Sequence, residues 1–179
     1  PGPANAAATK KRVHEKAASA ETTLREKGYS ASIGIGFPAF APEEFKRSFR
    51  SAWRAVNIGR KLRRNAPIFD IGDFELEDLL LSLNKEAAKE YAEKNLSKLF
   101  DAPQWSPELE ETLREWLRSP SCPGEVARRL GIHRNTLSYR LEKIGGLGSF
   151  DPKDPSDIFT LKISLLLRDL HIEQHQQRE

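Results

Sequence analysis

Two spacings of apolar residues divide the chain into a short mixed region and a long helical one. In the stretch YSASIGIGF, every second residue from Ala31 to Phe37 is apolar. A period of two predicts a strand with one apolar face. Residues 10–27 are rich in helix formers and end at Gly28, which predicts a helix with a glycine C-cap. Residues 43–64 carry the 3.6-residue spacing of a helix. The apolar run APIFDI, residues 66–71, predicts a second short strand.

The helix predicted over 43–64 has an apolar stripe that drifts after Asn57-Ile58-Gly59, where we expect a bend. The stripe consists of Phe45, Phe49, Ala52, Trp53 and Val56. One or two strands do not make a stable sheet alone. The missing strands therefore lie upstream in a longer parent, or another chain supplies them. The sequence has no methionine, so we expect a processed chain or an excised piece of a longer protein.

From Glu75 onward the pattern is helical to the end. ELEDLLLSL predicts one helix, Asn84 caps the next, and Ser106 with Pro107 opens a third. The fold class predicted is mainly α, with a small α/β N-terminal piece and a C-terminal helix-turn-helix bundle. The predicted divisions are a disordered end or tag (1–9), a partial α/β domain (10–72), connecting helices (73–104) and a helix-turn-helix domain (105–175).

Residues 123–144 have the pattern of two short helices joined by a tight turn. Gly131 stands where the chain must leave the first helix, and we expect positive φ there. Leu137, Leu141 and Ile144 recur at i, i+4 and i+7, which predicts the buried side of the second helix. At 100° per residue, the polar run that opens this helix then faces outward.

An exposed polar first turn on a helix that is held by leucines is typical of a recognition helix in the major groove. Asn pairs with adenine, Arg with guanine, and Thr contacts a base edge or a thymine methyl. Arg128, Arg129 and Lys143 are candidates for phosphate contacts. The residues predicted to bind DNA are His133, Arg134, Asn135, Thr136, Ser138, Tyr139, Arg140 and Lys143.

The run IHRNTLSYRLEKI resembles the C-terminal helix-turn-helix of the PucR-type and sugar-diacid (CdaR-like) transcriptional regulators, whose hallmark is HRNTL-x-YRL. The resemblance covers roughly 106–172 and places this domain in a Fis/PucR-like bundle. It implies a sequence-specific regulator in the bacterial cytoplasm that binds double-stranded DNA as a homodimer. RNA polymerase is a further candidate partner, and the small-molecule effector is expected to bind a region outside this chain.

The N-terminal piece is similar to the second half of a degenerate diguanylate-cyclase-like (GGDEF-like) domain, through YSASIGIG and the helix that follows. The chain has no G-G-D-E-F signature and no carboxylate pair for metal. We therefore predict no catalysis, no catalytic or metal-binding residues and no cofactor. The alternative function is a nucleotide-sensing or interaction module that uses this piece without catalysis.

Charge and composition leave two further questions open. Residues 45–69 hold eight basic residues and no acid, which indicates a solvated helix face or a second contact to DNA or nucleotide. These residues are Lys46, Arg47, Arg50, Arg54, Arg60, Lys61, Arg63 and Arg64. The last helix, from Ile158 to about Ile172, has two apolar stripes, which suit either a dimer seam or the covering of the helix-turn-helix core. The single cysteine, Cys122, fits a reducing compartment, and the apolar cluster Ile163–Leu167 is too short to cross a membrane.

Overall fold

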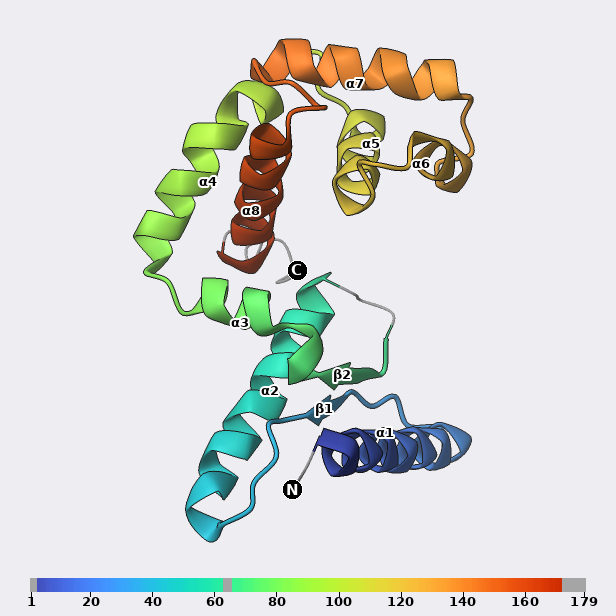
Figure 1. Cartoon of the computed structure of the whole chain (residues 1–179), viewed down its shortest axis with the longest axis vertical. Helices are drawn as coiled ribbons and strands as arrows, with labels where there is room; N and C mark the ends of the chain where they lie inside the picture. Colours follow the sequence, from blue (N-terminus) through green and yellow to red (C-terminus); the bar gives the residue numbers. More distant parts are fainter. Residues whose placement is uncertain (1–2, 63–65, 172–179) are drawn as a thin grey trace. The chain divides into compact units, whose positions relative to one another are not determined.

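The computed structural model describes residues 3–62 and 66–171, with side chains from residue 8 onward. The chain divides into two compact units, and the boundary along the sequence lies between Ser82 and Leu83 (Figure 1). Unit 1 contains a small parallel sheet with helices, and unit 2 is entirely helical. The predicted fold class, mainly α with a small α/β N-terminal piece, is confirmed. Arg63, Arg64 and the end of the predicted helix-turn-helix domain, 172–175, lie outside the described residues.

Unit 1 is built around two parallel strands, β1 and β2, in which Ile33 pairs with Ile68 and Ile35 with Asp70. Helix α1 begins at Pro3 rather than near residue 10, because an alanine-rich run has high helix propensity and proline suits a first turn. Gly28 ends it with φ of +82°. The elements are α1 (Pro3–Glu26), β1 (Ile33–Ile35), η1 (Pro42–Glu44), α2 (Phe45–Leu62), β2 (Ile68–Asp70), η2 (Ile71–Asp73) and α3 (Glu75–Leu81).

Glycines set the distance between α2 and the sheet. A Cβ on Gly34 would lie 2.1 Å from the Ala52 carbonyl oxygen, and one on Gly59 would lie 1.9 Å from the Phe69 ring. Gly59 therefore serves close packing, and α2 runs on through residues 57–59 as one helix. The helix does not break at the expected position, and glycine stands there because the ring of Phe69 fills the space that a side chain would need.

The apolar stripe of α2 packs on the sheet only through Ala52 and Val56, which lie over Gly34. The buried residues are Ser51, Ala55, Ile58 and Gly59, whereas Phe49 is 73% exposed and Trp53 is 63% exposed. The small residues Ser51, Ala55 and Gly59 allow a close approach of helix to strand, which the larger aromatic residues would prevent. Sequence periodicity located the stripe but did not identify the buried face.

A buried carboxylate ties α1 to the end of β2. Asp70 Oδ2 lies 2.7 Å from His14 Nε2 and 3.3 Å from Lys10 Nζ, and its Oδ1 accepts the Gly72 N–H at 2.8 Å. Burial raises the pKa of Asp70, but the bonds from His14, Gly72 and Lys10 outweigh it, so that the pKa lies below its ordinary 3.8. No sequence pattern pointed to this cluster, because His14 and Asp70 are 56 residues apart.

The Asp70 cluster predicts acid sensitivity of unit 1. Because the folded-state pKa is lowered, the ionised carboxylate stabilises the fold above the unfolded pKa, and this contribution is lost as pH falls through and below about 3.8. We expect wild type to be more stable than Asp70→Asn at neutral pH and the gap to narrow below pH 4. Urea unfolding from neutral pH to below pH 4 measures the difference in unfolding free energy between the two proteins. Asp73→Asn is the control variant. A pH-independent gap would contradict the assignment.

Unit 2 is a bundle in which α4 packs along α8. Its helices are α4 (Lys85–Phe100), α5 (Pro107–Arg118), α6 (Pro123–Arg129), α7 (Arg134–Gly148) and α8 (Pro155–His171). The helices predicted to connect the two domains, residues 73–104, belong to different units. Helix α3 is part of unit 1, and α4 contributes Leu96 and Leu99 to the core of unit 2. Asn84 caps α4 as predicted, since its Oδ1 accepts the Ala87 N–H at 3.1 Å.

One apolar stripe of α8 is buried within unit 2, and the other is covered only in part. Leu161, Leu165, Leu167 and Leu170 are buried, and α8 contacts α4 and α5. Only Phe159 of the large apolar residues on α8 stays well exposed among the described side chains, at 64%. Ile158, Ile163 and Leu166 beside it are half-buried. The helix thus covers the core of unit 2, and the dimer seam stays a prediction.

Candidate nucleic-acid interface

A tight turn joins α6 to α7 and sets the angle between them. Gly131 has φ of +65°, the positive value that was expected. The next residue, Ile132, donates its N–H to the Ala127 carbonyl at 3.0 Å. Val126 and Ala127 are buried under this turn. The small Ala127 side chain lets α6 cross α7 closely.

Helix α7 has one buried side and one exposed side, as the sequence predicted. Leu137, Leu141 and Ile144 are buried, and they face a core to which Leu113 and Trp116 of α5 also contribute. Tyr139 is 65% exposed. The other residues on the exposed side are His133, Arg134, Asn135, Thr136, Ser138 and Glu142. Lys143 is half-buried at the margin.

His133 caps the start of α7. Its backbone is extended, and its Nδ1 accepts the Asn135 N–H at 3.2 Å. A neutral imidazole that accepts through Nδ1 carries its proton on Nε2. The ring is exposed, so that Nε2 can donate to a group outside the protein. The same contact fixes the backbone of Asn135 at the first turn.

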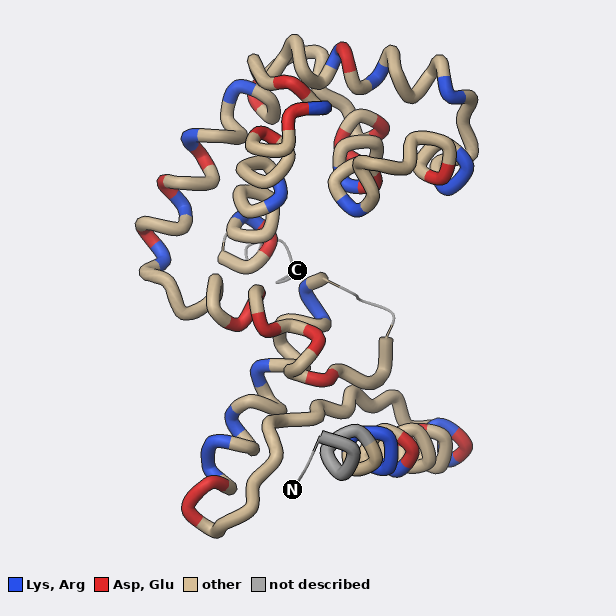
Figure 2. Tube along the Cα trace, viewed as in Figure 1, with Lys and Arg blue, Asp and Glu red and all other residues tan. Residues whose placement is uncertain are grey.

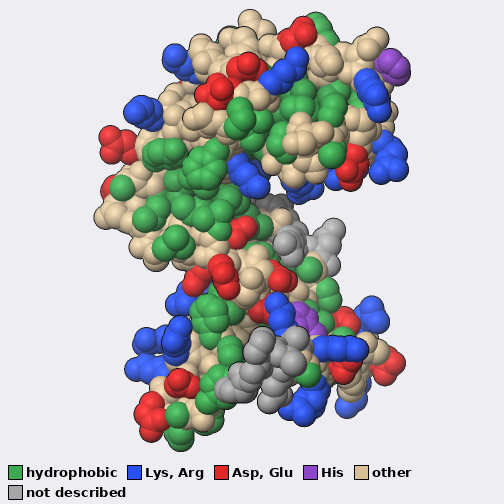
Figure 3. Space-filling model, in the orientation of Figure 1, with side chains coloured by type: hydrophobic (Ala, Val, Ile, Leu, Met, Phe, Trp, Pro, Cys, Tyr) green, Lys and Arg blue, Asp and Glu red, His purple; other side chains and the backbone are tan. Residues whose placement is uncertain are grey.

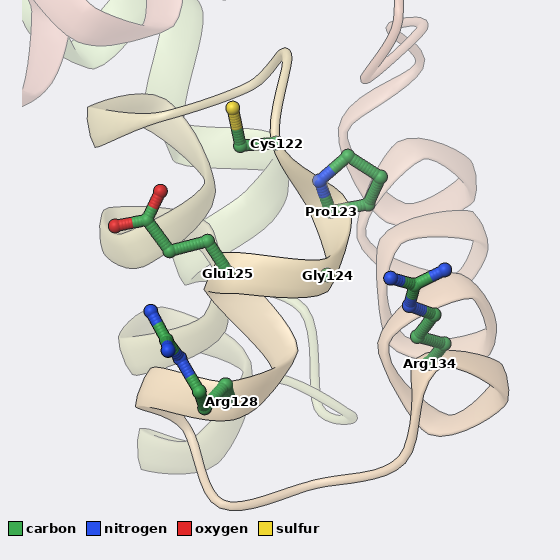
Figure 4. Close-up of a pocket in the computed structure, with 6 residues that line it drawn as sticks. All are labelled: Cys122, Pro123, Gly124, Glu125, Arg128 and Arg134. Carbon is green, nitrogen blue, oxygen red and sulfur yellow. The ribbon is translucent and has the colours of Figure 1, made fainter.

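Arg134 extends from the start of α7 towards the first turn of α6 (Figure 4). A Cβ on Gly124 would lie 2.3 Å from an Arg134 guanidinium nitrogen, so a larger residue there would displace the end of this side chain. Arg134 and Arg128 line a shallow depression of about 500 Å³ at this end of α6. Glu125 also lines this depression, and Figure 4 shows the guanidinium groups of Arg128 and Arg134 well apart, so each is placed to bind a phosphate oxygen singly.

Arg140 differs from the other predicted site residues. Its Nη1 donates to Thr112 Oγ1 at 3.1 Å, and Thr112, fully buried on α5, donates to the Glu108 carbonyl at 2.6 Å. The half-buried Arg140 thus holds α7 against α5. Thr112 was missed by sequence reasoning, and the available signal was a polar residue within the apolar stripe of α5.

The two neighbouring arginines of α6 have different surroundings. Arg129 pairs with Glu115 and with Glu125, each at 3.0 Å. Arg128 instead lines the depression on the side of Glu125, apart from Arg134 (Figure 4). Figures 2 and 3 show basic residues gathered around α6 and along α7. Of the three residues predicted to contact phosphate, Arg129 is therefore largely neutralised within unit 2.

A network of charged residues connects α5 and α8 behind the exposed side of α7. Arg114 of α5 bonds Asp169 of α8 at 2.7 Å and Glu110 at 2.9 Å. Hydrogen bonding to Asp169 raises the pKa of Arg114 above its ordinary value, so the group stays charged. The Trp116 indole N–H donates to the Pro152 carbonyl at 2.8 Å. These bonds fix α5, on which α7 packs, to α8 and to the loop that follows α7.

The part of the chain that the structure describes holds no group of three or more His, Cys, Asp or Glu placed to bind a metal ion. Within the same residues, none of the helices has the length and apolar character needed to span a membrane. The geometry of unit 2 offers an exposed polar and basic helix start.

Residues 109–167 match the family described as the PucR C-terminal helix-turn-helix domain. Among curated proteins, the purine catabolism regulatory protein of Bacillus subtilis is 32% identical over 69% of this chain and 23% of its own length. The carbohydrate diacid regulator of Escherichia coli is 29% identical over 82% of this chain and 38% of its length. The DNA-binding transcriptional activator AdeR of Bacillus subtilis is 30% identical over 58% of this chain and 24% of its length.

The chain therefore spans about a quarter to two fifths of the curated relatives it matches. A regulator of polyketide synthase expression from Bifidobacterium adolescentis has 21% identity and a TM-score of 0.40 over 67% of this chain and 46% of that one. The resemblance seen in HRNTL-x-YRL is thus confirmed by the family match. No comparison bears on the GGDEF-like interpretation of residues 10–72.

Proposed function

We propose that this chain binds specific DNA sequences through α7, because residues 109–167 match the PucR C-terminal helix-turn-helix domain family. The observation that carries the proposal is the first turn of α7. Its polar residues are exposed, while Leu137, Leu141 and Ile144 fix the same helix to a packed core. A rigid helix that presents side chains able to read base edges suits the major groove.

Each residue of this surface has a separate role in the proposal. Asn135 and Arg134 pair with base edges, and Thr136, Ser138 and Tyr139 contact neighbouring edges, methyl groups or sugars. His133, Lys143 and Arg128 contact phosphates and set the register. Arg140 acts as a positioning residue, since its guanidinium is bonded to Thr112.

The regulator acts as a homodimer in this proposal, with two recognition helices in successive major grooves about 34 Å apart. An effector bound outside residues 1–179 changes the affinity for DNA or the geometry of the dimer. RNA polymerase is the partner through which such a regulator acts on transcription. The bacterial relatives named above support a cytoplasmic setting, in which DNA is accessible.

The direct test is selection of bound fragments from a random duplex library, followed by anisotropy titrations of the selected and a scrambled duplex at two salt concentrations. We expect the selected duplex to bind at least about 10³-fold more tightly than the scrambled one. Equal, salt-sensitive binding to both duplexes would refute sequence-specific recognition.

The two arginines of α6 give a matched prediction about phosphate contacts. Arg128→Ala should reduce the slope of log affinity against log salt by about one, because one phosphate contact is lost. Arg129→Ala should leave the slope unchanged, because Glu115 and Glu125 already pair with that guanidinium. Anisotropy titrations over a salt series measure both slopes. Equal slope changes in the two variants would contradict the assignment.

A further inference from the structure

Helix α2 carries positive charge along its length and no negative charge. It contains six basic residues and no acid. Helix α4, by comparison, combines four lysines with three glutamates, and its Lys89 pairs with Glu93 at 3.6 Å. Figure 2 shows this contrast between the two helices. A helix face that is only solvated commonly carries both signs, as α4 does, so the single sign of α2 indicates an anionic partner.

The basic residues of α2 are spaced so that they repel one another. Lys46, Arg50 and Arg54 recur at intervals of four residues, and like charges at this spacing destabilise a helix. Arg54 is compensated within unit 1, since it pairs with Asp78 of α3 at 2.6 Å. Lys46 and Arg50 are exposed. A bound anion between them would remove the repulsion.

Much of this charge lies on the side of α2 that faces away from the sheet. The four buried residues of α2 define the side that packs inward. At 100° per residue, Lys46, Trp53 and Arg60 lie roughly 155–175° around the helix from the middle of that side, and Arg50 lies about 125° from it. These four residues are the outer face of α2. A strand added to the edge of the sheet would extend the sheet sideways and would not cover this face.

Trp53 lies among the basic residues of the outer face and is 63% exposed. An indole N–H is a donor only, so it suits a phosphate oxygen, as the lysine and arginine groups do. Lys46 and Arg60 are about 21 Å apart along the helix axis. Because a DNA strand places a phosphate about every 3.4 Å of its axis, the outer face is long enough to contact several phosphates.

We propose that the outer face of α2 is a second contact to double-stranded DNA, one that binds phosphates whatever the base sequence. Charge complementarity selects this partner, because a duplex is a dense array of phosphates and the face is basic throughout. In taking DNA as the ligand, the inference rests on the proposed function of α7. It adds that unit 1 contributes affinity, while α7 alone contributes sequence preference.

A matched pair of triple variants tests the contact. The first removes three positive charges from the outer face of α2, and the second removes three from exposed lysines of α4. Anisotropy titrations of the scrambled duplex over a salt series give the slope of log affinity against log salt. The α2 variant should lower this slope by about 2–3, and the α4 variant by less than about 0.5. The substitutions are Lys46→Gln, Arg50→Gln and Arg60→Gln in α2, and Lys89→Gln, Lys94→Gln and Lys98→Gln in α4.

The selected duplex separates this inference from the proposed function of α7. The α2 variant should keep the wild-type ratio of affinities for the selected and the scrambled duplex. Equal slope changes in the two triple variants would overturn the contact at α2 and leave recognition by α7 standing. A wild type without sequence preference, together with the expected slopes, would refute recognition by α7 and support the contact at α2. A wild type that binds neither duplex would overturn both.

Vesicles distinguish DNA from a membrane surface as the partner. Basic and aromatic residues on an exposed helix also suit anionic lipid. Wild type should not sediment with vesicles of phosphatidylcholine and phosphatidylserine. Vesicle binding that the α2 variant abolishes, with the DNA slope unchanged, would overturn the proposal. If the α2 variant loses its far-ultraviolet circular dichroism spectrum, Arg50→Gln alone replaces it and should lower the slope by about one.

Discussion

Asn135→Ala is expected to weaken binding to a selected duplex by about 10- to 100-fold, because one bidentate contact to adenine contributes about 1–3 kcal/mol of discrimination. The side chain is exposed, and the backbone N–H that bonds His133 is retained in alanine. Folding stability should therefore change by no more than about 0.5 kcal/mol. Anisotropy titrations against selected and scrambled duplexes measure the loss.

The affinities of Asn135→Ala for the selected and the scrambled duplex together show whether Asn135 recognises bases. Affinity for the scrambled duplex should stay the same, since non-specific binding rests on phosphates. Glu142→Ala is the matched control, because Glu142 is an exposed residue further along α7, and it should keep the preference for the selected duplex. An equal loss on both duplexes would mean that Asn135 contacts the backbone only.

Gly34→Ala should destabilise unit 1 by about 3 kcal/mol, the upper end of what overpacking usually costs. The new Cβ would lie 2.1 Å from the Ala52 carbonyl oxygen and 2.8 Å from its carbon. Both atoms belong to the backbone of α2, so no side-chain rotation relieves the clash, and the helix must move off the sheet. Peptide-level amide exchange should show faster exchange over β1, α2 and β2.

A glycine in open space provides the control for this variant. Gly146 lies within α7, and a Cβ there would meet nothing within 4 Å. Gly146→Ala should stabilise α7 by about 0.5–1 kcal/mol, because alanine loses less backbone entropy in a helix. Unchanged exchange across β1 and α2 in Gly34→Ala would show that α2 does not pack as closely as the structure has it.

The three variants on α6 and α7 act on different parts of the proposed contact. Arg128→Ala tests phosphate binding through the salt slope, and Asn135→Ala tests base recognition through the difference between duplexes. Arg140 belongs to neither class, since it bonds Thr112 within unit 2. Its substitution is expected to affect affinity for both duplexes through the position of α7.

Local signals in the sequence determined the elements and the presentation of α7. Leu137, Leu141 and Ile144 recur with the helical period, and this period fixes which side of α7 is buried, whatever it packs against. Gly131 marked the turn because glycine adopts positive φ without steric cost. The run HRNTL-x-YRL indicated the resemblance to the PucR-type regulators. For these features, neighbours within about seven residues carry the information.

Only the tertiary structure decided which surfaces meet. The sequence located the stripe of α2, but the buried face is the one with Ser51, Ala55 and Gly59, because small residues permit contact with the sheet. Arg129 and Arg140 match DNA-contacting positions in sequence, yet each bonds a group on α5. Asp70 bonds His14 of α1, which lies 56 residues away in the sequence. Such pairings depend on how elements dock, and periodicity along one element holds no information about the surface of another.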